Sequence, residues 1–155
     1  MQIPSDYKDL LKALNKHRVK YLIIGAYAVI YYTEPRYTKD IDIWVEPEIK
    51  NAKKVYEVLK EFGASLKGMS INDFMNPNLV YRMGVPPVRV DIMMGIPGIA
   101  FDEAWKHRSK GLFEGIKVNI IGIKELIKSK EKTKRDYDLK DIESLKLKLK
   151  LKRRK

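Results

Sequence analysis

Residues 37–47, YTKDIDIWVEP, form the segment that most constrains the fold of this chain. Apolar and polar residues alternate along it as in a β-strand, so its three aliphatic residues share one face. The opposite face carries Asp40, Asp42 and Trp44. Aspartate is uncommon in strands, and two carboxylates on one face repel each other. Either this face is exposed to water, or a cation lies between the two carboxylates.

A second strand and a helix precede this segment with no loop between them. The apolar run VKYLIIGA, residues 19–26, predicts a strand that stops at Gly25, and AYAVIYY predicts a helix that ends before Pro35. Gly25 allows a positive φ angle or the close approach of another group. A strand that enters a helix directly presents unpaired backbone N–H groups, a common setting for phosphate binding.

The remaining chain mixes helical and strand patterns without internal repeats. Helical spacing predicts helices over 5–18, 47–62, 98–108 and 123–150, and the last segment forms either one helix or two helices with a break near 131–136. Period-2 patterns predict strands over 79–84, 88–94 and 116–122, and the first two of these form a hairpin or a tight connection. The Leu–Lys alternation near the end has the period of a strand but continues a helical pattern, so both readings stay open. These elements predict an α/β (α+β) fold with a mixed sheet flanked by helices.

Length and composition predict one domain over residues 1–145, followed by a basic tail over residues 146–155. The apolar fraction of 45% is typical of a globular chain, and the absence of cysteine excludes disulfides, zinc–thiolate sites and thiol nucleophiles. No signal-peptide pattern opens the chain, and no apolar run is long enough to span a bilayer. We therefore expect a cytoplasmic protein without a membrane partner.

The net charge of +12 is concentrated at the end of the chain, where the last ten residues hold seven basic residues and no acidic one. Such a segment attracts nucleic acid or another polyanion, with an affinity that falls with salt. It is equally typical of a solvated chain end. Five further basic residues crowd one segment, as a solvated helix face or as cations that attract an anionic substrate: Lys128, Lys130, Lys132, Lys134 and Arg135.

A third aspartate, Asp91, lies on the predicted strand VRVDIMM. If this strand lies beside the one with Asp40 and Asp42, three carboxylates converge. Carboxylate oxygens are preferred ligands of Mg²⁺, and such a site commonly also takes phosphate oxygens of a substrate. Metal ions held in this way can promote an in-line phosphoryl displacement. Alternatively, Asp91 pairs with Arg82 or Arg89.

Together, Gly25 at a strand–helix turn, the Asp40-x-Asp42 strand and Asp91 resemble the nucleotidyltransferase superfamily of the DNA polymerase β type. The stretch YLIIGAYAVIYYTEPRYTKDIDIWV is most similar to the small prokaryotic members, the minimal nucleotidyltransferases and the abortive-infection toxin and antitoxin-like proteins. The later segment KRDYDLKDIESL, with Asp138 and Asp141, resembles a helical segment near the end of those members.

The resemblance implies transfer of a nucleoside monophosphate from a nucleoside triphosphate such as ATP to a hydroxyl of RNA, a protein or a small molecule. Asp40, Asp42 and Asp91 are then the catalytic ligands of Mg²⁺ or Mn²⁺, and Asp91 helps to deprotonate the acceptor. The expected nucleotide-binding residues are Gly25, Ala26, Arg36, Thr38 and Lys39.

Ala26 departs from the family pattern, which commonly has serine or glycine at this position. Alanine keeps its backbone N–H but offers no hydroxyl to a phosphate oxygen, a bond worth about 1.5–3 kcal/mol. Two alternatives therefore remain beside the active enzyme. The chain is a weakly active or regulatory, antitoxin-like nucleotide-binding protein that needs a partner protein, or it is a basic nucleic-acid-binding module that acts through its tail.

Overall fold

The computed structural model describes residues 5–34, 38, 40–84, 88–133 and 136–153. This part of the chain contains one six-stranded mixed sheet with the order β3-β4-β2-β1-β6-β5. The strands are β1 Tyr21–Ile24, β2 Asp40–Val45, β3 Val80–Met83, β4 Arg89–Met93, β5 Ser109–Phe113 and β6 Ile116–Ile120. The helices are α1 Ser5–Lys16, α2 Gly25–Tyr32, α3 Ile49–Phe62, α4 Phe101–Lys106, α5 Ile123–Thr133 and α6 Asp136–Arg153, with a 3₁₀ turn at Ile71–Met75.

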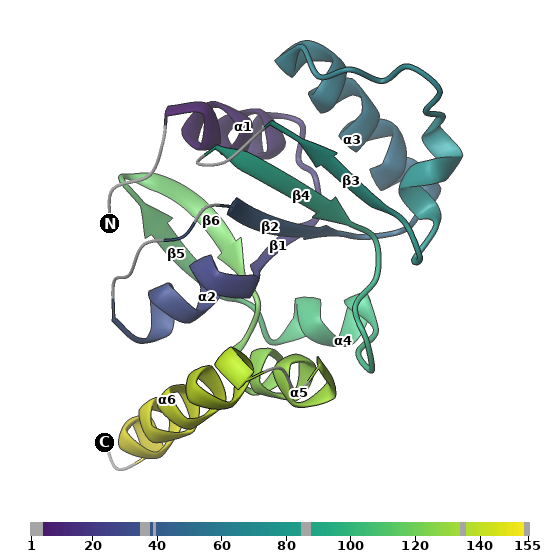
Figure 1. Cartoon of the computed structure of the whole chain (residues 1–155). Coiled ribbons are helices and arrows are strands. Elements are labelled where there is room, and N and C mark those ends of the chain that lie inside the picture. The colour runs from purple at the N-terminus through teal and green to yellow at the C-terminus, as the bar shows by residue number, and fades with distance from the viewer. Residues whose placement is uncertain (1–4, 35–37, 39, 85–87, 134–135, 154–155) are drawn as a thin grey trace.

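Helices cover both faces of the sheet (Figure 1). α1 and α3 lie on one face, and α2, α4, α5 and α6 lie on the other. The expected fold class, a mixed sheet flanked by helices, is confirmed. None of the helices described is long and apolar enough to cross a membrane.

The central strand β1 shows why the sheet is covered on both faces. All four of its residues are buried, so side chains on its two faces both contact helices. Its neighbours run in opposite senses: β2 pairs with it antiparallel and β6 parallel. The chain then enters α2 at Gly25, which has a φ of +66°, a value that glycine adopts without the steric cost of a Cβ. The site described below lies at this junction.

α3, which joins β2 to the β3–β4 hairpin, has strong local signals at both ends. The Glu48 side chain accepts hydrogen bonds from the backbone N–H groups of Lys50 and Asn51 at the start of the helix. Gly63 follows the helix in the left-handed region, with a φ of +88°. Because the amphipathic face of α3 packs against the sheet, this helix forms the crossover that brings β4 beside β2 in parallel.

The structure differs from the sequence-based expectation at β5, and it decides two readings that the sequence left open. β5, which is SKGLF, was not predicted, because a short edge strand with a central glycine carries little strand signal. The Leu–Lys segment is helical, since residues up to Arg153 continue α6 with Lys146, Lys148 and Lys150 exposed. Trp44 does not lie on a wet face: it is buried in edge-to-face contact with Phe101 of α4.

Candidate active site

The three aspartates predicted to converge lie together on neighbouring strands. β2 and β4 pair in parallel, and the register places Asp42 directly opposite Asp91. Asp40 lies two residues earlier on the same face of β2. One carboxylate oxygen from each of Asp40, Asp42 and Asp91 lies within 4.8 Å of the other two. The parallel pairing therefore brings together carboxylates that lie about 50 residues apart in the sequence.

The beginning of α2 lies against this group. The antiparallel register of β1 with β2 pairs Ile24 with Asp42, so the next residue, Gly25, reaches the Asp42 side chain. A Cβ atom at position 25 would overlap Asp42 Oδ2. The glycine is thus required both by its positive φ and by the close approach of the carboxylate. Ala26 follows in the first turn of α2, where backbone N–H groups have no partner within the helix.

The environment of Asp42 disfavours its charged form. Burial is the main cause, and the neighbouring charges of Asp40 and Asp91 add to it; together they raise the pKa of Asp42 to about 7. The positive charges of Arg89 and Lys130 act in the opposite direction. A cation bound among the three carboxylates would favour the ionised form of Asp42.

Two arginines pair with the carboxylates from the β3–β4 hairpin. Arg89 Nη2 lies 2.7 Å from Asp40 Oδ2 and 3.4 Å from Asp91 Oδ2, and Arg82 Nε lies 3.0 Å from Asp91 Oδ1. Asp91 therefore lies opposite Asp42, as the convergence of the carboxylates requires, and it also pairs with both arginines, as the alternative reading expected. The bridge from Arg89 to Asp40 was not predicted, although Arg89 and Asp91 share a strand face in the sequence.

The donor set fits a hard divalent cation. All three side chains offer carboxylate oxygens, and no histidine or cysteine belongs to the group. Oxygen-only sites of this kind favour Mg²⁺ or Mn²⁺ over softer metals such as zinc or copper. Beside the effect of burial, the charges of Asp40 and Asp91 raise the pKa of Asp42, and a bound cation would offset this repulsion. Asp40, Asp42 and Asp91 can therefore hold such an ion.

The other predicted binding residues are placed less fully. The Thr38 hydroxyl donates to the backbone carbonyl of Asp40 at 3.3 Å, so it lies beside the carboxylates. Arg36 and Lys39 lie outside the described residues. Nothing in the sequence indicated that Tyr7 of α1 lies near the site. Its hydroxyl donates to the carbonyl of Arg89 at 2.9 Å and thereby supports β4 next to the site.

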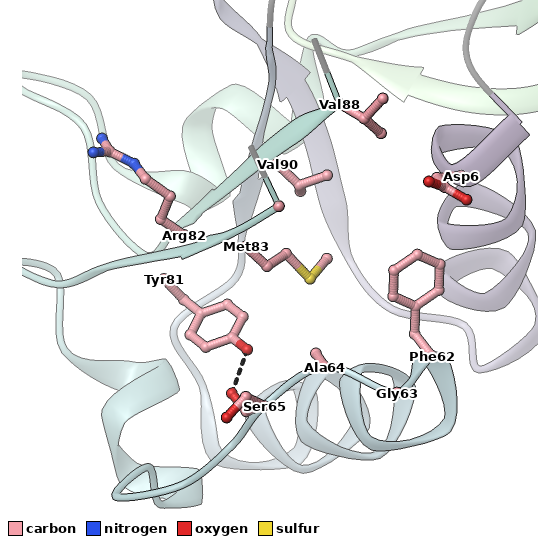
Figure 2. A pocket seen from close by; sticks show the side chains of 11 residues that line it. Asp6, Phe62, Gly63, Ala64, Ser65, Tyr81, Arg82, Met83, Val88 and Val90 are labelled. Carbon is pink, nitrogen blue, oxygen red and sulfur yellow. Dashed lines mark hydrogen bonds between the residues drawn. The ribbon is translucent and has the colours of Figure 1, made fainter. Parts of the chain in front are cut away.

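A pocket of about 490 Å³ lies on the opposite face of the sheet and does not include the aspartates. Figure 2 shows Tyr81, Met83, Val88 and Val90 around it, with the Arg82 side chain directed away from it. This alternation follows from the strand period, which sends Arg82 to the face of Asp91. The apolar pocket and the carboxylate site are therefore separate features of the hairpin.

Residues 4–155 match the family described as nucleotidyl transferase of unknown function (DUF2204). No curated protein gives a significant match.

Solved structures with the same fold include nucleotidyltransferases of low sequence identity. The lincosamide antibiotic adenylyltransferase LnuA, in its lincomycin-bound form, is 14% identical with a TM-score of 0.58 over 93% of this chain and 96% of that chain. ANT(2")-Ia in complex with adenylyl-2"-tobramycin is 15% identical, with a TM-score of 0.57 over 93% and 86%. An antigenic nucleotidyltransferase-like protein from Paracoccidioides brasiliensis is 18% identical, with a TM-score of 0.55 over 90% and 74%.

The family match extends over nearly the whole chain, and the structural matches independently place its fold among nucleotidyltransferases. The glycine turn into α2 and the aspartates on β2 and β4 lie within the matched residues. The chain therefore belongs to the DUF2204 family of nucleotidyl transferases.

Proposed function

We propose that this chain transfers a nucleoside monophosphate from a nucleoside triphosphate to an acceptor hydroxyl in a reaction that depends on Mg²⁺. The observation that carries the proposal is the convergence of Asp40, Asp42 and Asp91 within 4.8 Å of one another, directly beside the N-terminus of α2. Family membership supports nucleotidyl transfer as the reaction class. The metal and the assignment of residues follow from the chemistry of the site.

Each group then has a distinct part in the reaction. Asp40, Asp42 and Asp91 would hold the divalent cation, which when bound would supply positive charge to the triphosphate and its leaving group. The backbone N–H groups at the beginning of α2 donate to phosphate oxygens, and Gly25 lets the phosphates approach closely. Asp91 accepts the proton of the acceptor hydroxyl, whose oxygen attacks the α-phosphorus as the bond to the β-phosphate oxygen breaks.

The acceptor is the least constrained part of the proposal. The structural neighbours named above act on antibiotics according to their descriptions, which makes a small hydroxylated molecule one class to test. RNA and a partner protein are the other two classes. The basic residues on α6 favour an anionic acceptor on electrostatic grounds.

Ala26 supports a second candidate, a chain that binds nucleotide but turns it over only with a partner protein. The side chain at this position contributes no hydroxyl to the phosphates, so the backbone groups of α2 act without it. A lost hydrogen bond to a charged group costs about 1.5–3 kcal/mol, or roughly 10- to 150-fold in affinity. Ala26→Ser therefore tests this candidate: an increase in turnover of that size would identify Ala26 as the cause of a slow reaction.

The test measures pyrophosphate release and transfer of radiolabelled nucleotide from each of the four nucleoside triphosphates, with pools of RNA, protein and small hydroxylated acceptors. Release that requires both Mg²⁺ and an acceptor is expected for the wild type. Asp91→Asn should abolish it and retain nucleotide binding, whereas Asp9→Asn on the exposed face of α1 serves as the matched control. Turnover retained by folded Asp91→Asn would contradict the assignment of the base. No nucleotide binding by the wild type at millimolar Mg²⁺ would contradict the proposal as a whole.

A further inference from the structure

The order of the strands gives the candidate active site a direction. In the order β3-β4-β2-β1, the strand β1 that leads into α2 lies on one side of the carboxylates, and the edge strand β3 lies on the other. Gly25 at the beginning of α2 lies against Asp42. On the far side, Asp91 of β4 lies opposite Arg82 of β3 in the antiparallel register. The carboxylates therefore lie between the N-terminus of α2 and β3.

These two sides have different parts in the reaction. The β- and γ-phosphates, which leave as pyrophosphate, bind at the beginning of α2 in the function proposed above, and this inference rests on that function. In an in-line displacement the attacking oxygen approaches the α-phosphorus from the side opposite the leaving group. The acceptor hydroxyl, which gives its proton to Asp91, therefore lies over β4, and the rest of the acceptor extends over β3.

β3 presents a cation and an apolar side chain on this face of the sheet. Alternation along the strand places Arg82 and Val80 on the face of Asp91, and Val80 lies opposite Met93 of β4. Figure 2 shows the Arg82 side chain directed away from the pocket on the other face. The Arg82 side chain is 57% exposed and Val80 is 51% exposed, so an acceptor can contact both.

The pairing with Asp91 engages only part of the Arg82 guanidinium. Arg82 Nε lies 3.0 Å from Asp91 Oδ1, and Arg82 Nη2 lies 3.5 Å from Asp91 Oδ2. A guanidinium has five N–H groups, so it can donate to a second oxyanion at the same time. Exposed ion pairs contribute little to stability, and Arg89 already pairs with Asp91 from within β4. Stability is therefore a weak explanation for a second arginine at this carboxylate.

The guanidinium of Arg82 restricts the chemistry of the acceptor. A basic residue on an edge strand also hinders pairing with another sheet, but lysine serves that purpose equally well. The planar fork of arginine matches the oxygens of a phosphate or carboxylate, which lysine binds only as a point charge. A hydroxyl that donates to Asp91 and an oxyanion that accepts from Arg82, each over about 3 Å, lie a few bonds apart in one molecule. Of the two oxyanions, phosphate is the more strongly attracted to a chain with a net charge of +12.

We propose that the acceptor is a phosphate ester whose hydroxyl lies a few bonds from its phosphate, and that Arg82 binds this phosphate while Val80 contacts the carbon atoms between the two groups. In the transfer step the hydroxyl oxygen bonds to the α-phosphorus as the bond to the β-phosphate oxygen breaks. The electron pair of that bond leaves with pyrophosphate, and the hydroxyl proton passes to Asp91. The phosphate of the acceptor stays bound to Arg82 and takes no part in bond breaking.

The test measures how matched acceptors bind to the full chain, loaded with Mn²⁺ and the α,β-methylene analogue of the best-bound nucleoside triphosphate, in calorimetric titrations. The members of each pair differ in the anionic group: glycerol and glycerol 3-phosphate, ribose and ribose 5-phosphate, and an RNA trinucleotide and its uncharged methylphosphonate analogue. The first two pairs represent free phosphate esters, and the third represents the end of a nucleic acid. Glycerate replaces the phosphate of the first pair by a carboxylate.

Four substitutions at the acceptor side and one control complete the design. Arg82→Gln removes the charge, and Arg82→Lys keeps the charge without the fork. Val80→Glu adds a negative charge two residues away on the same face without changing a partner of Asp91, and Val80→Gln is its uncharged match. Arg18→Gln changes an exposed arginine between α1 and β1. Mn²⁺ binding without nucleotide or acceptor reports on the carboxylates alone.

We expect the wild type to bind at least one phosphorylated acceptor about tenfold or more tightly than its neutral partner, the effect of one hydrogen bond between charged groups. Arg82→Gln should remove this difference, and Arg82→Lys should restore part of it. Val80→Glu should reduce the difference about threefold through like-charge repulsion and leave the binding of the neutral acceptors unchanged. Val80→Gln and Arg18→Gln should match the wild type in all titrations.

The inference is wrong if no phosphorylated acceptor, free or nucleic acid, binds more tightly than its neutral partner, or if the preference persists in Arg82→Gln. If Arg82→Gln does not fold, an unchanged preference in folded Val80→Glu overturns the inference in the same way. Tighter binding of glycerate than of glycerol 3-phosphate would replace phosphate by carboxylate and contradict the proposed acceptor class.

The remaining outcomes identify the source of the phosphate and separate the two proposals. A preference confined to the RNA pair assigns the phosphate to a nucleic acid, whereas a preference in the glycerol or ribose pair assigns it to a free ester. Pyrophosphate release that requires Mg²⁺ and a neutral acceptor would overturn this inference and leave the proposed function standing. If the wild type binds no nucleotide with Mg²⁺, both proposals are wrong.

Discussion

The substitution Asp42→Asn should stabilise the metal-free protein at neutral and alkaline pH. Burial and two neighbouring carboxylates raise the pKa of Asp42 from its ordinary value of 3.8 to about 7. Each unit corresponds to about 1.4 kcal/mol, so ionised Asp42 costs the folded state up to about 4 kcal/mol. Relaxation and water penetration reduce such penalties, and we expect a gain of about 1–4 kcal/mol for asparagine, which has the same shape and no charge.

The effect of Asp42→Asn on stability should depend on pH. Between about pH 4 and pH 7 the folded protein holds a proton on Asp42 that the unfolded chain has released, so the stability of the wild type falls as pH rises through this window. The difference between Asp42→Asn and wild type should accordingly be near zero at pH 4 and reach its full value above pH 7. For a chain of this length, 1 kcal/mol corresponds to about 2–4 °C in Tm.

Thermal denaturation in EDTA at pH 4–8.5 measures this difference, with Asp9→Asn as the matched control for loss of an exposed carboxylate. Adding Mg²⁺ should reverse the order of stability, because the wild type gains free energy from metal binding and Asp42→Asn does not. The reasoning would be refuted if Asp42→Asn were less stable than wild type at pH 8 in EDTA, or if the difference did not change with pH.

Two further substitutions test the geometry of the site and of its supporting strand. Gly25→Ala should lower stability by at least about 1–2 kcal/mol and weaken Mn²⁺ binding, because a Cβ at this positive φ overlaps the Asp42 carboxylate. Gly115 also has a positive φ but has open space around it, so Gly115→Ala should lower stability without changing Mn²⁺ affinity. Paramagnetic resonance titrations measure the Mn²⁺ affinity of both variants. Asn51→Ala should lower the free energy of unfolding, measured by urea denaturation, by about 2 kcal/mol or more, because the buried Asn51 amide forms hydrogen bonds with the backbone of Lys20 and Glu46. Asn72 is exposed, and Asn72→Ala should change stability little. An equal effect of both substitutions would contradict the role given to these hydrogen bonds.

The sequence determined the local structure and the chemistry of the site. Alternation in DIDIWV fixed both the strand and the shared face of Asp40 and Asp42, because the period of a strand is a local property of the backbone. The apolar run that ends at Gly25 determined the direct entry into α2. Glu48 and Gly63 mark the beginning and the end of α3. β5 could not be read in this way, since edge strands obtain their pairing from a neighbour rather than from their own residues.

Only the tertiary structure decided which side chains meet. Periodicity assigns Asp91 to a face of β4 but does not say which strand lies beside it; the parallel register with β2, reached through the α3 crossover, places it opposite Asp42. The same applies to the pairing of Lys130 with Asp141, which depends on how α5 packs against α6. Local patterns depend on residues a few positions apart, whereas these contacts depend on the burial of whole apolar faces, which no short segment of the sequence contains.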